Sequence, residues 1–236
     1  MSPESGFEIG FDLCGDRLGI VDKNGRYIEA NEILCLLYNY LHEYKGWKGG
    51  VVRNLATTHT LDKLAKSFNE ECYEVPIGFK HISSAIDKYD CVLGGESSGG
   101  LTVRGHIHGK DSIYAASLFV EMVCVTGKFP SDMLKEFEEK FGKAVMVECN
   151  LAFEPSFKET AYDILINKRL LPEFSCGKKI VKTNYIDGAK VYFEDGSFVI
   201  CRFSGTEPLL RIFAEANDKE VAKTYINDFK NFLKLN

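Results

Sequence analysis

Residues 51–95 read VVRNLATTHTLDKLAKSFNEECYEVPIGFKHISSAIDKYDCVLGG, and this stretch decides the fold of the first half of the chain. Short apolar runs in it have the length and composition of buried strands, and the segments between them carry apolar residues at helical spacing. The strand-like and helix-like segments alternate in the order 51–55, 60–68, 72–75, 80–88 and 91–93. Thr60 is placed to cap the first helix. This alternation predicts a parallel sheet covered by helices.

The alternation of strand-like and helix-like segments continues on both sides of this stretch. Toward the N-terminus, a strand at 18–21 is followed by the turn signal Asp22–Ile28, and Asn31 is expected to cap a helix with an apolar face. Toward the C-terminus, helices are predicted at 111–126 and 131–141. The first part of the chain is therefore predicted to be an α/β domain.

The pattern changes near residue 143, where strand candidates begin to follow one another. Asp187-Gly188 and Asp195-Gly196 are hairpin turn signals, and the chain ends in an amphipathic helix. The strand candidates lie at 145–153, 179–185, 190–193, 197–203 and 209–215, with a helix at 157–167. A smaller α+β domain is predicted to begin at residue 143.

Composition narrows the class of protein. The 236 residues are 45% hydrophobic and 27% charged, with a formal net charge of -5, which is typical of a globular protein with a real core. The lack of a Lys/Arg run argues against nucleic acid or an anionic membrane as partner. No membrane span or signal peptide is visible. The eight scattered cysteines predict free buried thiols in a reducing cytoplasm.

The loop Arg202–Pro208 reads RFSGTEP and is the clearest candidate for a binding site. Its backbone N–H groups and hydroxyls can converge on an anion, and arginine suits the fixed arrangement of phosphate oxygens. The alternative is a polar hairpin with solvated arginines. The candidate phosphate-binding residues are Arg202, Ser204, Gly205, Thr206 and Arg211.

The segment Gly94–Gly100, GGESSGG, follows a strand and permits two functional interpretations. Read as G-x-S-x-G, it would make Ser97 the nucleophile of a serine hydrolase. The only histidines after Ser97 are His106 and His108, and no Asp precedes either of them in this interval, so the hydrolase order of catalytic residues is not met. The segment that follows also does not predict the required helix.

The second interpretation is recognition of a sugar. Glu96 can accept hydrogen bonds from two vicinal hydroxyls, Ser98 can donate and accept, and the glycines let a ring approach the backbone. A plain turn, in which Glu96 caps a neighbouring helix, remains a further possibility.

A third loop, Asp12–Arg17 or DLCGDR, places two carboxylates four residues apart around a glycine. Such oxygens suit Mg²⁺ in the presence of a phosphate. Cys14 would be a poor ligand because its thiolate is soft. Asp12 and Asp16 are the candidate metal ligands.

Together these loops resemble the α-D-phosphohexomutase superfamily, which includes phosphoglucomutase and phosphomannomutase. The resemblance rests on four ordered motifs. Asp12, Asp16 and Arg17 match D-x-D-x-D-R with Cys14 at the middle Asp, Gly78-Phe79-Lys80 resembles the family's lysine segment, Gly95–Gly99 matches G-E-x-S-G, and Arg202–Pro208 matches R-x-S-G-T-E-P.

The resemblance implies three regions. Residues 1–16 would end a preceding domain and carry the metal loop, 17–142 would form a Rossmann-like α/β sandwich that binds sugar, and 143–236 would form the α+β phosphate-binding domain. Arg17 and Lys80 would act at the reacting phosphate, although Lys80 taken alone suits a solvated lysine at a helix start. Mg²⁺ would be the cofactor, at a site weakened by Cys14.

The implied activity is that of an isomerase interconverting hexose 1-phosphate and hexose 6-phosphate through a phosphoserine and a bisphosphorylated sugar. The family's phosphoserine string, T-A-S-H-N, does not occur in these residues. The chain is therefore expected to be inactive alone and to act with the missing N-terminal domains of the same enzyme. The alternative is a non-catalytic phosphosugar-binding module. The identity of the sugar stays open among glucose, mannose, glucosamine and pentose.

Overall fold

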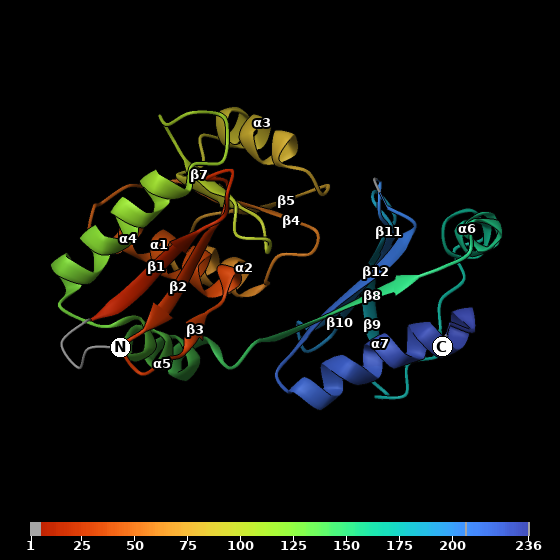
Figure 1. Ribbon diagram of the computed structural model, residues 1–236. Helices are drawn as coiled ribbons and strands as arrows, with labels where there is room; N and C mark the ends of the chain where they lie inside the picture. Colours follow the sequence, from red (N-terminus) through yellow and green to blue (C-terminus); the bar gives the residue numbers. More distant parts are fainter. Residues whose placement is uncertain (1–5, 206, 236) are drawn as a thin grey trace. The chain divides into compact units, whose positions relative to one another are not determined.

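The computed structural model describes residues 6–205 and 207–235, and the chain divides into two compact units at residues 1–142 and 143–236 (Figure 1). The first unit contains a four-stranded sheet in the order β5-β4-β6-β7. Its strands are β4 (Val51–Asn54), β5 (Cys72–Val75), β6 (Leu93–Gly95) and β7 (Leu101–Val103). Strands β5, β4 and β6 are parallel, and β7 is antiparallel to β6. The predicted α/β fold is confirmed, and the sheet is mixed because β7 is antiparallel.

Helices cover both faces of this sheet because its central strands are apolar on both sides. The adjacent residues Val51 and Val52 are fully buried, and each belongs to a different hydrophobic cluster. Helix α3 (Phe79–Tyr89) packs on the Val52 side. The Val51 side is covered by α1 (Ala30–Glu43), α2 (Thr60–Ser67), α4 (Ser112–Thr126) and α5 (Pro130–Phe141).

An antiparallel sheet of β1 (Phe7–Phe11), β2 (Leu18–Asp22) and β3 (Tyr27–Ile28) completes the first unit. The turn predicted at 22–28 joins β2 to β3. Strand β1 was not predicted. Because β1 pairs with β2 along its whole length, residues on the two sides of the expected boundary at residue 16 share one sheet.

Two predicted helix caps are wrong. Helix α1 begins after Glu29, because Glu29 and Glu32 form a reciprocal capping box. The Asn31 side chain instead accepts a hydrogen bond from the backbone N–H of Thr58 at 3.2 Å. Thr60 is the first helical residue of α2 rather than its cap.

The second unit is a five-stranded antiparallel sheet in the order β8-β12-β11-β10-β9. Its elements are β8 (Val145–Ala152), α6 (Pro155–Tyr162), a π-helix (Asp163–Asn167), β9 (Ile180–Asn184), β10 (Ala189–Phe193), β11 (Phe198–Phe203), β12 (Leu209–Ala216) and α7 (Lys219–Leu233). Apolar residues of α7 pack with alternate residues of β10, β11 and β12 in one core. The predicted helix at 157–167 is thus an α-helix that continues as a π-helix.

All eight cysteines are free, as predicted, but not all are buried. Cys14 lies in an exposed turn and Cys124 is exposed on α4. No single helix in the described part of the chain is long and apolar enough to cross a membrane. Helices α4 and α5, bent by 79° relative to each other, meet that criterion only when they are counted together.

Candidate functional site

The loop Ser204–Pro208 joins β11 to β12 and places two arginines side by side. Arg202 lies directly opposite Arg211 in the antiparallel register. Their neighbours Cys201 and Ile212 are buried in the core with α7, so the arginines lie on the other face of the sheet. The hairpin therefore presents two guanidinium groups on one surface.

Each arginine contacts a carboxylate of its own unit. The closest approach of Arg202 Nη2 to Asp187 is 3.3 Å, and Arg211 Nη2 lies 2.7 Å from Glu207 Oε2. Like charges directly opposite each other across strands are destabilising, and these carboxylates offset the repulsion. The buried Nε of Arg211 has no hydrogen-bond partner among residues 6–205 and 207–235.

The loop backbone is held by its own hydrogen bonds. Ser204 is buried, its N–H donates to the carbonyl of Leu209 at 2.8 Å, and its Oγ accepts from the N–H of Glu207 at 3.3 Å. Gly205 is exposed at the tip. Thr206, the remaining predicted phosphate ligand, lies outside the described residues.

The turn Asp187-Gly188 has a role that its sequence did not reveal. Gly188 has φ +100°, and a Cβ built on it would lie 2.6 Å from Cβ of Arg202 and 2.6 Å from the carbonyl oxygen of Cys201. Only glycine allows this close approach. The turn therefore fixes both the path of β11 beside Arg202 and the carboxylate that contacts its guanidinium.

The candidate sugar loop connects β6 to β7 as a hairpin. The N–H of Glu96 donates to the carbonyl of Gly100 at 2.9 Å, and the N–H of Gly99 donates to the carbonyl of Glu96 at 3.0 Å. The residues after Ser97 thus return in an antiparallel strand. A nucleophile elbow requires a strand followed by a helix, so the serine-hydrolase interpretation is excluded.

Glu96 is the buried centre of this loop, with 6% of its surface exposed. Its Oε1 accepts from Asn54 Nδ2 at 3.1 Å and from the N–H of Gly78 at 3.2 Å, while Lys110 Nζ lies 3.4 Å from Oε2. Because Gly78 is the N-cap of α3, Glu96 does bind a helix start, as the plain-turn alternative supposed. Ser98 is exposed.

Asn54 supports Glu96 from the end of β4. Its Oδ1 accepts from the N–H of Ala56 and from Thr57 Oγ1, both at 2.9 Å. Thr57 Oγ1 in turn accepts from the N–H of Ser97 at 3.2 Å. This network was not predictable from the sequence motifs. Its only signal was polar residues at the carboxyl end of a buried parallel strand, where ligand sites of α/β sheets lie.

The predicted metal loop is the turn between β1 and β2. Asp12 Oδ1 accepts from the N–H of Asp16 at 2.8 Å and from the N–H of Arg17 at 3.2 Å. The carbonyl of Gly15 accepts from both the N–H and the Oγ of Ser112, at 3.0 and 2.7 Å. Ser112 is the first residue of α4, so this helix anchors the loop.

The donor set of this loop suits Mg²⁺ only in part. Asp12 and Asp16 are exposed and supply hard oxygen ligands, whereas the intervening Cys14 supplies a soft one. No cluster of three or more potential metal-binding side chains occurs in the described part of the chain. Mg²⁺ commonly binds through one or two carboxylates together with substrate phosphates, and two carboxylates fit that use.

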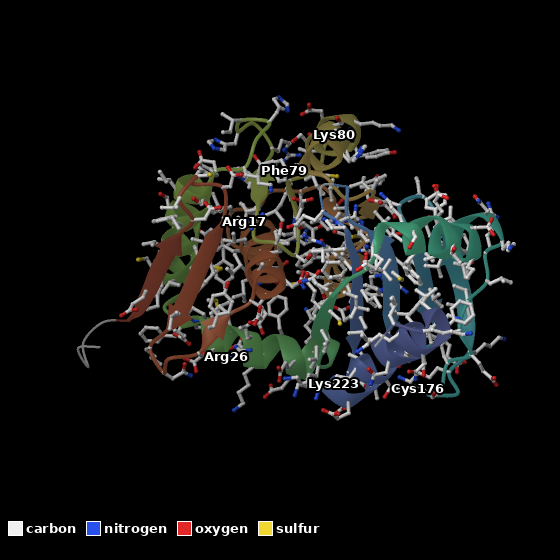
Figure 2. The ribbon with its side chains drawn as sticks, turned by 45° about the vertical axis from the view of Figure 1, so that its right-hand side comes forward. Arg17, Arg26, Phe79, Lys80, Cys176 and Lys223 are labelled. Atoms are coloured by element: carbon white, nitrogen blue, oxygen red, sulfur yellow. The ribbon has the colours of Figure 1, made fainter. Side chains whose placement is uncertain are left out.

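The metal and sugar loops are neighbours within the first unit. A Cβ built on Gly99 would lie 3.6 Å from Cβ of Arg17. The start of α3 adjoins the same region through the Gly78 N–H that contacts Glu96. Figure 2 labels Arg17, the residue before β2, and the exposed Lys80 in the first turn of α3. The structure thus brings all the predicted site residues of this unit onto three adjacent segments.

Comparisons with known proteins identify both units. The model for phosphoglucomutase/phosphomannomutase alpha/beta/alpha domain III matches residues 29–141, and the model for the C-terminal domain matches residues 152–231. A Thermococcus kodakarensis protein described as phosphoglucomutase/phosphomannomutase is 28% identical over 222 residues. That alignment covers 93% of this chain and 45% of the relative. The chain thus spans about half the length of the curated relatives it matches.

Solved structures share the fold. A phosphoglucomutase/phosphomannomutase family protein from Burkholderia thailandensis has a TM-score of 0.77 at 23% identity, covering 98% of this chain and 47% of that one. An N-acetylphosphoglucosamine mutase from Aspergillus fumigatus, solved in complex with GlcNAc-6P and magnesium, has a TM-score of 0.64 at 15% identity. That comparison covers 97% of this chain and 52% of the fungal protein.

Proposed function

This chain belongs to the phosphoglucomutase/phosphomannomutase family, and we propose that it supplies the sugar- and phosphate-recognising part of a phosphohexomutase. The proposed activity interconverts a hexose 1-phosphate and a hexose 6-phosphate through a phosphoserine and a bisphosphorylated sugar. The observation that carries this proposal is the pair Arg202 and Arg211, half-buried and opposite each other on one face of a serine- and glycine-containing hairpin. Phosphoryl transfer depends on positioning and charge stabilisation, which such a surface supplies.

The non-reacting phosphate would bind at this hairpin. Two guanidinium groups offer paired N–H donors that match phosphate oxygens. Ser204, Gly205 and Thr206 would contribute hydroxyl or backbone donors. Binding there would hold the sugar still while chemistry occurs at its other end.

Glu96 and Ser98 would bind sugar hydroxyls in the first unit. A carboxylate offers about four acceptor positions, and Glu96 uses two of them for hydrogen bonds from Asn54 and Gly78, while Lys110 forms an ion pair with its other oxygen. The remaining capacity, with the exposed Ser98 beside it, suits a hydroxyl. The geometry of hydroxyls around these two residues would decide among glucose, mannose, glucosamine and pentose phosphates.

Arg17 and Lys80 would act at the reacting phosphate, as a charge partner and as a proton-transfer or phosphate-contacting group. Both are exposed cations, on the segments adjacent to Glu96. Asp12 and Asp16 would hold Mg²⁺, which would neutralise phosphate charge when bound. Cys14 would make this binding weak. The eight free thiols favour a cytoplasmic location.

The proposal is tested by calorimetric titration of the chain with glucose 1-phosphate, glucose 6-phosphate and glucose. We expect both phosphates to bind, glucose to bind far more weakly, and Arg202→Ala and Arg211→Ala each to weaken phosphosugar binding at least tenfold. The matched control is Arg169→Ala, which removes an arginine elsewhere in the second unit. Equal binding of glucose and its phosphates would contradict the proposal.

A second candidate is a phosphosugar-binding module without catalysis, and the exposed thiol of Cys14 in the metal loop favours it. The two functions differ in turnover. A family protein carrying a phosphoserine segment together with these residues should convert glucose 1-phosphate to glucose 6-phosphate in Mg²⁺. Binding without such conversion would select the module.

A further inference from the structure

The two carboxylates beside the phosphate-binding arginines differ in how they are held. Asp187 precedes β10 in the turn fixed by Gly188, and it approaches both Nε and Nη2 of Arg202 at 3.4 and 3.3 Å. Its side chain is 25% exposed and that of Arg202 is 15% exposed. This contact is therefore half-buried, and the close backbone approach at Gly188 holds it in place.

Glu207 makes a different kind of contact. It lies on the loop itself, its side chain is 53% exposed, and it engages only Nη2 of Arg211. The neighbouring Nε of Arg211 is buried and has no partner in the described chain. A single carboxylate oxygen thus occupies an edge of the guanidinium that could bind a ligand through two N–H groups.

Arg202 is held by Asp187 through a different part of its guanidinium group than the part of Arg211 that Glu207 contacts. Asp187 takes the Nε side, so the guanidinium is oriented while its Nη1 group stays outside this contact. An arginine fixed in this way loses less conformational entropy when a phosphate binds. Arg211, in contrast, can offer its Nε and Nη2 together only after Glu207 moves away.

We propose that the two carboxylates have opposite effects on anion binding, Asp187 as a positioning residue for Arg202 and Glu207 as a displaceable cover of Arg211. This inference rests on the proposed phosphate-binding function of the hairpin. The proposal therefore predicts that removing the two carboxylates changes the affinity for phosphate in opposite directions. Charge alone predicts that removing either carboxylate strengthens phosphate binding, because each is an anion beside an anion site. If Asp187 positions Arg202, its removal should instead weaken phosphate binding.

The test uses the full chain and calorimetric titration with glucose 6-phosphate and with inorganic phosphate. Glu207→Gln should tighten binding about two- to fivefold, the range expected when an exposed ion pair no longer competes. Asp187→Asn should weaken binding about three- to tenfold, because Arg202 loses charge-assisted hydrogen bonds that orient it. Asp187→Glu, which keeps the carboxylate, should restore part of the loss.

Glu220→Gln is the matched control, because Glu220 makes an ion pair of the same 2.7 Å length with Lys223 in α7, away from the hairpin. It should leave both affinities unchanged. A second readout needs no variant of Asp187. In the wild-type chain, the NMR signal of Arg211 Nε–H should shift on adding phosphate, while that of Arg202 Nε–H should be protected from exchange throughout.

The outcomes separate this inference from the proposed function. If the wild-type chain binds neither ligand, the phosphate-binding function itself fails. If it binds but Asp187→Asn and Glu207→Gln change the affinity in the same direction, the opposite roles are overturned. Should Asp187→Asn not fold, an exchange-labile Arg202 Nε–H in the wild type would overturn the positioning role on its own.

Discussion

The Asn54 side chain joins the end of β4 to the loop that carries Glu96, so Asn54→Ala perturbs the fold and the candidate sugar site together. The substitution removes three hydrogen bonds, from Ala56 N–H and Thr57 Oγ1 to Oδ1 and from Nδ2 to Glu96. Asn54 is 3% exposed and Thr57 is fully buried, so water replaces these partners poorly. The Glu96 carboxylate also loses a donor.

The expected cost follows from these contacts. A neutral hydrogen bond contributes about 1 kcal/mol and one to a charged group about 1.5–3 kcal/mol, so the first unit should lose about 3–5 kcal/mol of stability. In a unit of this size such a loss lowers the midpoint of thermal unfolding by roughly 10 °C or more. Phosphosugar binding should weaken as well, because Glu96 is less firmly placed.

The assay can follow the first unit alone. Trp47 is the only tryptophan and packs against the core of that unit, so its fluorescence in urea reports the unfolding of residues 1–142. Asn39→Ala on α1 is the control, since it removes the same group away from the Glu96 network. A loss below about 1 kcal/mol, the value of a single ordinary hydrogen bond, would refute the reasoning.

Three further predictions concern other contacts. Gly188→Ala should destabilise the second unit by about 2–4 kcal/mol and weaken phosphate binding, because residue 188 has a positive φ and its new Cβ would clash with Arg202. Calorimetric unfolding and phosphate titration check these two effects. Hydrogen bonds from the N–H of Tyr114 and from His106 lower the pKa of Asp111, so its stabilising contribution is present above the unfolded value of about 3.9 and is lost as pH falls through the lower, folded value. Asp111→Asn should flatten the acid limb of Trp47-detected stability, and an unchanged limb would contradict this. Cys14→Asp should tighten Mg²⁺ binding about tenfold or more by adding a hard ligand, and equal affinities in a Mg²⁺ titration would show that Cys14 does not limit the site.

Much of the fold was predictable because local periodicity and packing agree. The helices and the buried strand β4 carry apolar residues at the spacing that their environment requires. The strands that escaped prediction depend on their partners. The three-residue strand β7 exists only through pairing with β6, and β1 only through pairing with β2. Pairing between strands leaves little signal within either strand taken alone.

The candidate site also has a part that the sequence predicts and a part that it does not. Its loops were recognisable because each motif is continuous in sequence, whereas the residues that support them are distant along the chain. Asn54 is 42 positions from Glu96, and Asp187 is 15 positions from Arg202. Ser112 is 97 positions from the Gly15 carbonyl that it holds. Such contacts arise from the topology of the fold, so no local sequence pattern predicts them.

The helix caps illustrate a local competition. Asn31 and Thr60 are both good capping residues, yet neither caps its helix. Glu29 and Glu32 satisfy the start of α1 reciprocally, which leaves Asn31 available to hold the backbone of Thr58. The Asn31 side chain can serve either a helix cap or a tertiary hydrogen bond, and in the folded chain it makes the tertiary one.

The most direct test of the central claim is an NMR titration of the ¹⁵N-labelled chain with glucose 6-phosphate. We predict that backbone amide signals move in two places, at Ser204–Glu207 in the second unit and at Glu96–Gly99 in the first. Glucose alone should leave the Ser204–Glu207 signals in place, and inorganic phosphate should move them. Shifts confined to surfaces away from both loops, or no saturable shift at Ser204–Glu207, would contradict the claim that this chain recognises a phosphorylated sugar.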